Sequence, residues 1–218
     1  MPMFKAVYHS LHTLWQHTRH CPLCGHSAAH SPYVICTDCW QDLPWLNDSV
    51  LRHELIIQAA CEYADPINQI VQQFKYHEKL HHQRLLTQLI LQLPLPRVQA
   101  IVPMPISTAR LCERGYNQAM LIAEGVAKQL NLPIWQPVLR RAEHTQKGLS
   151  RLERIAGIEQ QFVPDLRVRT RFRRVMIIDD VVTTGSSIYA LSQALTTLGC
   201  QRIYPICVAA ASVSREAR

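Results

Sequence analysis

The sequence predicts an α/β protein, in which a mostly parallel sheet is flanked by helices, with a small N-terminal module that holds a metal ion through four cysteines. From about residue 54 onward, short apolar runs alternate with amphipathic stretches, a pattern typical of a parallel sheet covered on both faces. Two Cys-x-x-Cys pairs near the N-terminus have the spacing of a metal site. No apolar run approaches the roughly 18 residues that would span a bilayer.

The chain divides into two predicted parts. Residues 1–48 comprise a short amphipathic helix over residues 1–20 and the cysteine-rich module, and residues 54–218 form the α/β domain. Apolar residues at helical spacing predict that first helix. A length of 218 residues fits one medium domain with a small appendage.

The elements of the α/β domain follow from local patterns along the chain. Short apolar runs predict strands at residues 56–63, 98–102, 134–138, 174–178 and 203–208. Helical spacing of apolar residues predicts helices over residues 67–90, 107–130 and 185–198. Gly199 is the expected end of the last helix. Residues 140–165 are polar and charged and are expected to form a closing flap.

Composition leaves several classes of partner open. The formal net charge is +7, and four thiolates holding one Zn²⁺ would make it less positive. This balance suits phosphorylated ligands, nucleic acid or solubility alone. The N-terminus has no continuous apolar core and no small-residue cleavage site, so we expect a cytoplasmic protein without membrane insertion.

Cys21, Cys24, Cys36 and Cys39 form two pairs that flank one loop. Each Cys-x-x-Cys turn offers two sulfurs to one ion, and Zn²⁺ prefers four ligands in a tetrahedron. Gly25 relieves the backbone where it must curl under the metal. Four thiolates leave no open coordination position, so the predicted zinc site is structural. The other four cysteines stand singly and are expected to be small core residues.

Histidines offer alternative metal ligands. Three of them lie near the module, and one could replace a cysteine: His20, His26 and His30. His77 and His81 form an i, i+4 pair beside Glu78, which could be a second metal site or a solvated helix face. We favour four thiolates and a solvated face.

The most informative stretch runs from Val175 to Ser187. An apolar strand ends in Asp179 and Asp180, a hydroxyl-rich loop follows, and Gly185 opens a helix. Ligands of open α/β sheets bind at the carboxyl ends of strands, and the unpaired N–H groups of a helix start suit a phosphate. The alternative is a capped helix after a core strand, which leaves the two acids unexplained.

Two carboxylates beside a phosphate would repel it unless they bound another part of the ligand. Carboxylates accept hydrogen bonds and sugar hydroxyls donate them, so a sugar with a 5-phosphate and free 2- and 3-hydroxyls suits the arrangement. The chain has no Gly-x-x-x-x-Gly-Lys, which argues against an ATPase.

This stretch resembles the motif with which type I phosphoribosyltransferases bind 5-phosphoribosyl-1-pyrophosphate (PRPP). The resemblance implies that family's mostly parallel sheet, with Asp179 and Asp180 as the catalytic acids on the ribose, the hydroxyl loop on the 5-phosphate, and Mg²⁺ arriving with the pyrophosphate. The PRPP-binding residues that it implies are Asp179, Asp180, Val181, Val182, Thr183, Thr184, Gly185, Ser186 and Ser187.

The stretch Val102-Pro-Met-Pro105, followed by a predicted helix, looks like the pyrophosphate loop of the same family. Basic side chains there and in the flap would stabilise the leaving pyrophosphate electrostatically. The residues assigned to the pyrophosphate loop and flap are Met104, Pro105, Ser107, Arg110, Arg114, Lys147 and Arg151.

Residues 21–210 as a whole resemble the ComF family, also called ComFC or GntX-like, of competence proteins. The motifs that carry this likeness, besides the cysteine pairs, are Phe74-Lys75-Tyr76, Glu113-Arg114-Gly115-Tyr116-Asn117-Gln118 and Gln146-Lys147-Gly148-Leu149-Ser150-Arg151. One departure is Gly157, where relatives usually carry Asn. The resemblance implies a role in natural transformation and DNA uptake, with single-stranded DNA and a competence helicase or recombination protein as partners.

Two functional hypotheses remain open from the sequence. The first is a Mg²⁺-dependent phosphoribosyltransferase, which would displace pyrophosphate from C1 of PRPP with an unidentified acceptor. Transferases for 6-oxopurines often carry a carboxylate at the position of Thr183, so that acceptor class is not favoured. The second is a non-catalytic module that senses PRPP or a nucleotide and binds single-stranded DNA or a protein partner.

Overall fold

A computed structural model of the chain describes residues 20–28, 31–141 and 161–211. It forms two compact units, Met1–Leu43 and Pro44–Arg218, and each is considered by itself. The helix predicted over residues 1–20 lies outside the described residues, except for His20. The sequence-based boundaries of 1–48 and 54–218 differ from these units because the stretch after Pro44 already forms a strand of the main sheet.

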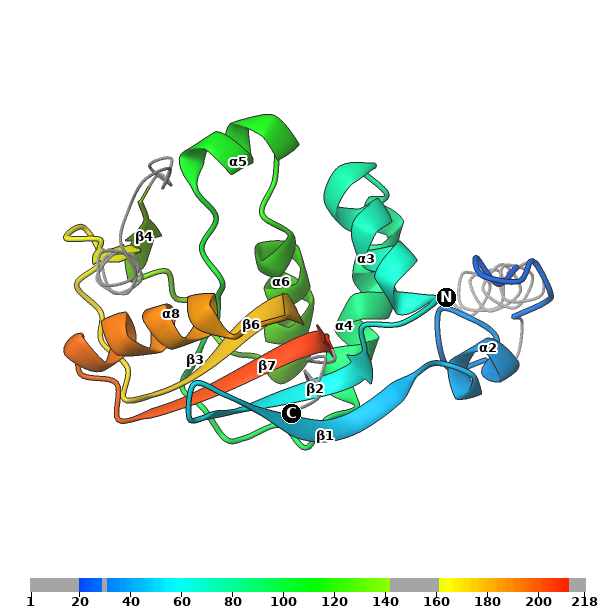
Figure 1. Cartoon of the computed structure of the whole chain (residues 1–218), viewed down its shortest axis with the longest axis horizontal. Helices are drawn as coiled ribbons and strands as arrows, with labels where there is room; N and C mark the ends of the chain where they lie inside the picture. Colours follow the sequence, from blue (N-terminus) through cyan, green and yellow to red (C-terminus); the bar gives the residue numbers. More distant parts are fainter. Residues whose placement is uncertain (1–19, 29–30, 142–160, 212–218) are drawn as a thin grey trace, which may run out of the picture. The chain divides into compact units, whose positions relative to one another are not determined.

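The larger unit is built on a five-stranded sheet in the order β1-β2-β7-β6-β3 (Figure 1). Strands β2, β7, β6 and β3 pair in parallel, and β1 is an antiparallel edge strand. The strands span Trp45–Arg52 (β1), Leu55–Glu62 (β2), Ala100–Pro103 (β3), Arg174–Val182 (β6) and Arg202–Ala210 (β7). The predicted α/β class with a mostly parallel sheet is therefore confirmed.

The strands differ from the sequence-based expectations mainly in three respects. Strand β1 was not among the predicted strands. Strand β6 continues past residue 178 because its pairing with β7 runs on to Val182 and Ala210. The short strand predicted at residues 134–138 is wrong. There Ile134 makes one isolated bridge to Ile101, and a separate two-stranded sheet pairs Val138–Arg140 (β4) with Phe162–Pro164 (β5).

The helical regions are more broken than the apolar periodicity suggested. The stretch over residues 67–90 forms α3 (Ile67–Tyr76), a 3₁₀ turn η1 (Leu80–His82) and α4 (Gln83–Leu91). The helix predicted over residues 107–130 is two helices, α5 (Thr108–Arg114) and α6 (Gln118–Leu130).

Local backbone chemistry explains the break between α5 and α6. Gly115 ends α5 in the left-handed region with φ 81°, which a glycine adopts without steric cost. Asn117 then caps α6 by accepting hydrogen bonds from the N–H groups of Ala119 and Met120. A helix-ending glycine and a helix-starting asparagine two positions apart override the continuous apolar spacing.

Helices cover both faces of the sheet. Helix α8 (Ser186–Thr197) shares a buried cluster with β6, in which Ile188 and Leu191 pack with Val175 and Ile177. Helices α4 and α6 contact the sheet through β2, β7, β6 and β3. In the described part of the chain, no helix has the length and apolar character needed to cross a membrane.

Candidate functional site

The predicted acid-and-hydroxyl turn lies at the carboxyl end of β6. Asp179 and Asp180 are among the last four residues of the strand, and α8 begins at Ser186. Thr183 and Thr184 are exposed between them. A hollow of about 80 Å³ is lined by Asp179 and by every residue from Val181 to Ile188. The structure thus brings the predicted turn residues together around an opening rather than inside the core.

The loop is shaped for close approach of a small anion. Gly185 adopts φ 82°, and a Cβ there would lie 2.5 Å from the Cβ of Arg52, so only glycine fits without displacement. The hydroxyls of Thr184 and Ser186 lie 3.0 Å apart. The first N–H groups of α8 open onto the same loop and carry the positive end of the helix dipole.

The two acids have different electrostatic surroundings. Asp180 is buried, and its Oδ2 lies 2.9 Å from Nζ of Lys75. Burial lowers the pKa of Lys75, but the charge and hydrogen bond of Asp180 and the charges of Asp179 and Tyr76 together raise the pKa by more, so the ammonium is retained. Burial and the neighbouring Asp180 charge raise the pKa of Asp179 to about 8. The pair therefore combines one salt-bridged carboxylate with one carboxyl that holds its proton near neutral pH.

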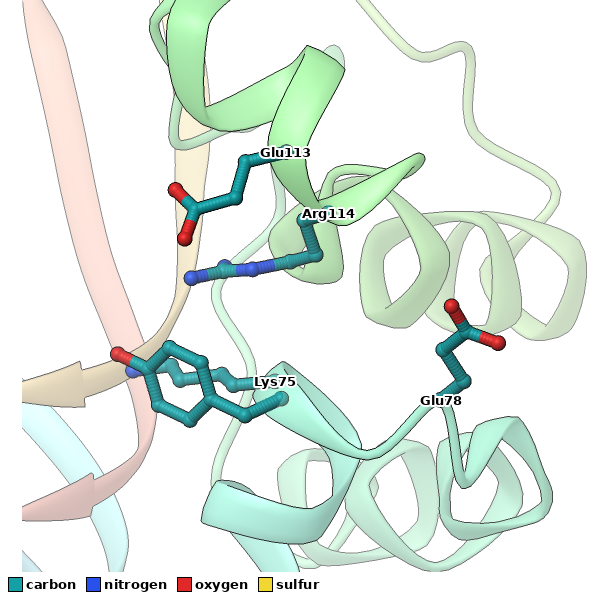
Figure 2. Close-up of a pocket in the computed structure, with 5 residues that line it drawn as sticks. Lys75, Glu78, Glu113 and Arg114 are labelled. Atoms are coloured by element: carbon teal, nitrogen blue, oxygen red, sulfur yellow. The ribbon is translucent and has the colours of Figure 1, made fainter.

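Lys75 is a site residue that the sequence analysis did not assign, although it lies in the quoted Phe74-Lys75-Tyr76 motif. It lies in the last turn of α3 and lines a second hollow of about 100 Å³ together with Arg114. Figure 2 shows the guanidinium of Arg114 beside the carboxylate of Glu113, whereas the Lys75 side chain extends toward the end of β6. The guanidinium of Arg114 lies 5.1 Å from the ring centroid of Tyr76 and donates to Gln118.

The segment assigned to the pyrophosphate loop is held firmly between β3 and α5. The N–H of Met104 donates to the carbonyl of Ile178 at 2.9 Å, and Asn117 donates to the carbonyl of Met104 at 3.0 Å. The buried hydroxyl of Ser107 accepts from the N–H of Arg110 and so caps α5. Pro105 is half-buried between them and Arg110 is exposed. Lys147, Arg151 and most of the predicted flap lie outside the described residues.

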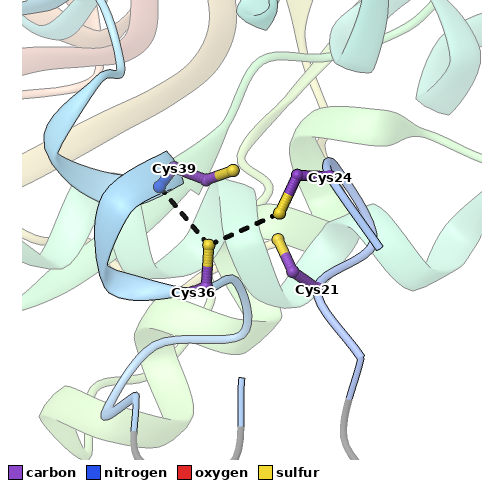
Figure 3. A group of neighbouring side chains, drawn as sticks. All are labelled: Cys21, Cys24, Cys36 and Cys39. Atoms are coloured by element: carbon purple, nitrogen blue, oxygen red, sulfur yellow. Dashed lines mark hydrogen bonds between the residues drawn. The ribbon is translucent and has the colours of Figure 1, made fainter. Parts of the chain in front are cut away.

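Four sulfurs converge in the smaller unit (Figure 3). The Sγ atoms of Cys21, Cys24, Cys36 and Cys39 all lie within 4.8 Å of one another. Among the described residues, this is the cluster of histidine, cysteine and carboxylate side chains that could hold a metal ion, such as zinc. His82 follows the His77–His81 pair in the sequence. Its Nε2 lies 3.1 Å from Oε1 of Gln73.

Two tight turns position these sulfurs. In the first, the N–H of Gly25 donates to the carbonyl of Cys21 at 2.8 Å, and Gly25 adopts φ 76°. In the second, Cys36 is the N-cap of α2 (Thr37–Gln41) and its Sγ accepts from the N–H of Cys39. Burial raises the pKa of the Cys21 thiol. Hydrogen bonds to its sulfur, mainly from backbone N–H groups, together lower the pKa by more, so that it falls to about 6. At Cys21 these donors favour the thiolate, the form that binds zinc, whereas burial and the neighbouring thiols raise the pKa of Cys39.

The fold and these two sites define the class: an α/β protein with a hollow at a strand end and a separate cluster of four cysteines that could hold a metal ion. No protein-family model matches the chain. It is 31% identical to competence protein F of Haemophilus influenzae over 84% of this chain and 82% of that protein. The chain therefore belongs to the ComF family, as its motifs predicted.

Other relatives agree with this assignment. The DNA utilization protein YhgH of Salmonella typhi is 31% identical over 86% of this chain and 82% of that protein. Competence protein ComFC of Bacillus subtilis is 25% identical over 91% of this chain and 80% of that protein.

Solved structures with partial similarity are phosphoribosyltransferases. Glutamine PRPP amidotransferase from B. subtilis gives a TM-score of 0.43 at 14% identity, over 59% of this chain but only 26% of that chain. Orotate phosphoribosyltransferase from Aeropyrum pernix gives 0.34 at 16% identity, over 79% and 77%. Since both TM-scores are below 0.5, the family assignment rests on the sequence relatives.

Proposed function

We propose that the chain binds PRPP, together with Mg²⁺, in the hollow at the end of β6. The observation that carries this proposal is a hollow lined by Asp179 and the open hydroxyl loop, with Asp180 next to it at the end of the same strand. The 5-phosphate would accept hydrogen bonds from the loop hydroxyls and the first N–H groups of α8. Asp179 and Asp180 would bind the ribose hydroxyls.

The metal would be held mainly by the ligand. Mg²⁺ prefers oxygen ligands, keeps several waters, and commonly joins phosphates to one or two carboxylates. The two acids supply such oxygens, although Oδ2 of Asp180 is also engaged by Lys75. When bound, the metal would neutralise charge on the pyrophosphate. Arg110, Arg114 and the flap residues Lys147 and Arg151 are the basic side chains proposed to share that task.

The proposed biological setting is DNA uptake and use. The relatives are named for competence and for DNA utilization, and the net charge of +7 is compatible with a nucleic-acid partner. We propose single-stranded DNA and a competence helicase or recombination protein as partners. If the site turns over, the reaction is displacement of pyrophosphate from C1 of PRPP by a nucleophilic acceptor, with pyrophosphate as the leaving group.

Isothermal titration calorimetry with PRPP and MgCl₂ tests the ligand. We expect saturable binding by the parent protein and none by the Asp179→Asn/Asp180→Asn variant, because neutral amides, each with a single acceptor oxygen, replace the two carboxylates that would bind the ribose hydroxyls and the metal. Asp48→Asn, an exposed acid on the edge strand β1, is the matched control and should bind as the parent does. A parent protein that binds no PRPP at millimolar concentration would remove the assignment.

Pyrophosphate release distinguishes a transferase from a binding module. PRPP, MgCl₂ and the protein are incubated with a panel of nucleobases and with single-stranded oligonucleotides. Release that needs both an acceptor and Asp179 would identify an enzyme. Binding of PRPP without release across the panel would favour a module that senses the ligand.

A further inference from the structure

The turn between β1 and β2 lies against the loop from Thr183 to Ser187, which we call the phosphate loop because of the proposed ligand. No sequence pattern predicted this contact. Arg52 pairs with Leu55 across the hairpin, and the two residues between them, His53 and Glu54, have φ of 46° and 64°. Two positive φ values are what a two-residue type I′ turn requires. Residues other than Gly, Asn and Asp adopt them at a steric cost, so this turn is held in a conformation that its side chains do not favour.

Arg52 attaches this turn to the loop. Its Nε donates to the carbonyl of Thr183 at 2.9 Å, and its Nη2 donates to the carbonyl of Ala211 at 3.0 Å. Its Cβ occupies the space that a side chain at Gly185 would need. The guanidinium therefore fixes the loop backbone from the side, which places the neighbouring His53 beside the start of α8.

His53 extends a line of polar atoms into the loop. Its Nε2 lies 3.1 Å from Oγ of Ser186, and that oxygen lies 3.0 Å from Oγ1 of Thr184. The His53 ring also lies 5.5 Å from the ring of Tyr189 on α8, centroid to centroid. Ser186 lines the hollow that we assign to the phosphate.

A hydroxyl has one proton to donate and two lone pairs that accept. If Nε2–H of His53 donates to Oγ of Ser186, the hydroxyl proton of Ser186 must point elsewhere. One acceptor within reach is Oγ1 of Thr184 at 3.0 Å, and an anion in the hollow that both hydroxyls line would be the other. An imidazole N–H held at this position thus prepares the serine as a donor before the ligand arrives.

We propose that His53 is a positioning residue of the phosphate site, which orients the Ser186 hydroxyl and so favours sugars that carry a 5-phosphate. The inference rests on the proposed PRPP site and deepens it. Arg52 holds the turn in place, and His53 acts through Ser186 without touching the pyrophosphate end of the ligand.

Calorimetry with two probes tests this role. His53→Asn removes the imidazole but keeps a residue that tolerates positive φ. We expect its affinity for PRPP with MgCl₂ to fall about 3- to 10-fold, the effect of one hydrogen bond. Its affinity for pyrophosphate with MgCl₂, which lacks the 5-phosphate, should stay unchanged. Glu54→Asn, at the next position of the same turn, is the control and should bind both probes as the parent does.

A double-mutant cycle shows whether the effect passes through the serine. In a Ser186→Ala background, His53→Asn should weaken PRPP binding no further, because residues that act as a unit are not additive. Additive losses, equal losses for both probes, or unchanged PRPP affinity in His53→Asn would each overturn the inference while leaving the PRPP site intact. A parent protein that binds neither probe would instead overturn the proposed function, and this inference with it.

Discussion

At the scale of single residues, the contact between Lys75 and Asp180 organises the candidate site. The acids were predictable because an acidic pair follows an apolar strand and precedes Thr-Thr-Gly. Their ammonium partner was not, because Lys75 stands at the end of a helix far away in the sequence, where a lysine is ordinarily solvated. Only the folded chain shows that Lys75 is mostly buried against Asp180.

Removing the ammonium should expose the cost of that burial. Lys75→Met leaves the buried Asp180 without its countercharge, and we expect a loss of about 3 kcal/mol in the free energy of unfolding. Adding Asp180→Asn to Lys75→Met should recover part of the loss, since no charge then remains buried alone. Lys128→Met, at an exposed position on α6, should change stability by less than about 0.5 kcal/mol. Urea denaturation measures all four proteins, and equal losses at Lys75 and Lys128 would contradict the ion pair.

Asp179 predicts a specific dependence of stability on pH. Its pKa is raised to about 8 in the folded protein, against about 3.9 in an unfolded chain. Between these values the folded state keeps a proton that the unfolded chain releases, so the contribution of Asp179 to stability falls as pH rises and levels off above the folded pKa.

The comparison of parent and variant isolates this effect. Asp179→Asn cannot titrate, so the free energy of unfolding of the variant relative to the parent should increase from about pH 5 to about pH 8. The buried His82, whose pKa is lowered to about 4, contributes equally to both proteins and cancels. Urea denaturation at several pH values measures the difference. A difference that does not change with pH would show that Asp179 is ionised throughout.

At the scale of elements, the sequence predicted which segments form strands and helices better than where they end. Apolar runs mark buried strands, but β6 continues through two acids because its pairing with β7 is set by the neighbouring strand. Similarly, apolar spacing continues across Gly115 although the glycine and Asn117 divide the helix. Strand β1 pairs antiparallel with β2, and its Arg52 contacts the loop after β6. Both features arise only from tertiary structure, so no local pattern predicts them.

Two glycines with positive φ, Gly185 just before α8 and Gly199 just after it, allow a matched pair of substitutions. Gly199→Ala, at φ 95° with no atom within 4 Å of the new Cβ, should cost about 1 kcal/mol, from backbone strain alone. Gly185→Ala adds a collision with the Cβ of Arg52 and should cost about 2 to 4 kcal/mol. It should also weaken PRPP binding, because the loop must shift. Thermal and urea denaturation compare the two variants, and equal costs would show that Arg52 does not press on the loop.

At the scale of the whole molecule, each of the two units carries its own candidate site. Equal spacing within two cysteine pairs was enough to predict the cysteine cluster, because four ligands and a tight turn impose strong local constraints. The hollow after β6 is lined by one stretch of the chain, but the contacts that hold this stretch in place come from Arg52 and His53 of the distant β1–β2 turn. The cluster is therefore predictable from a motif, whereas the full hollow depends on long-range packing.

Metal content tests the smaller unit. We expect about one zinc per chain by elemental analysis after purification without chelators. Cys36→Ser should lose the metal, because three sulfurs do not close a structural site. Cys112→Ser, at an exposed cysteine on α5, should retain it. Because the hollow is built from the larger unit alone, Cys36→Ser should keep the PRPP affinity of the parent. A preparation without metal that is otherwise folded would contradict the zinc assignment.

A crystal structure of the parent protein with PRPP and Mg²⁺ tests the central claim most directly. We expect the 5-phosphate to lie within hydrogen-bonding distance of the loop from Thr183 to Ser187, and the ribose hydroxyls to contact Asp179 and Asp180. Electron density for the sugar phosphate at any other place, with the hollow after β6 filled only by water, would contradict it.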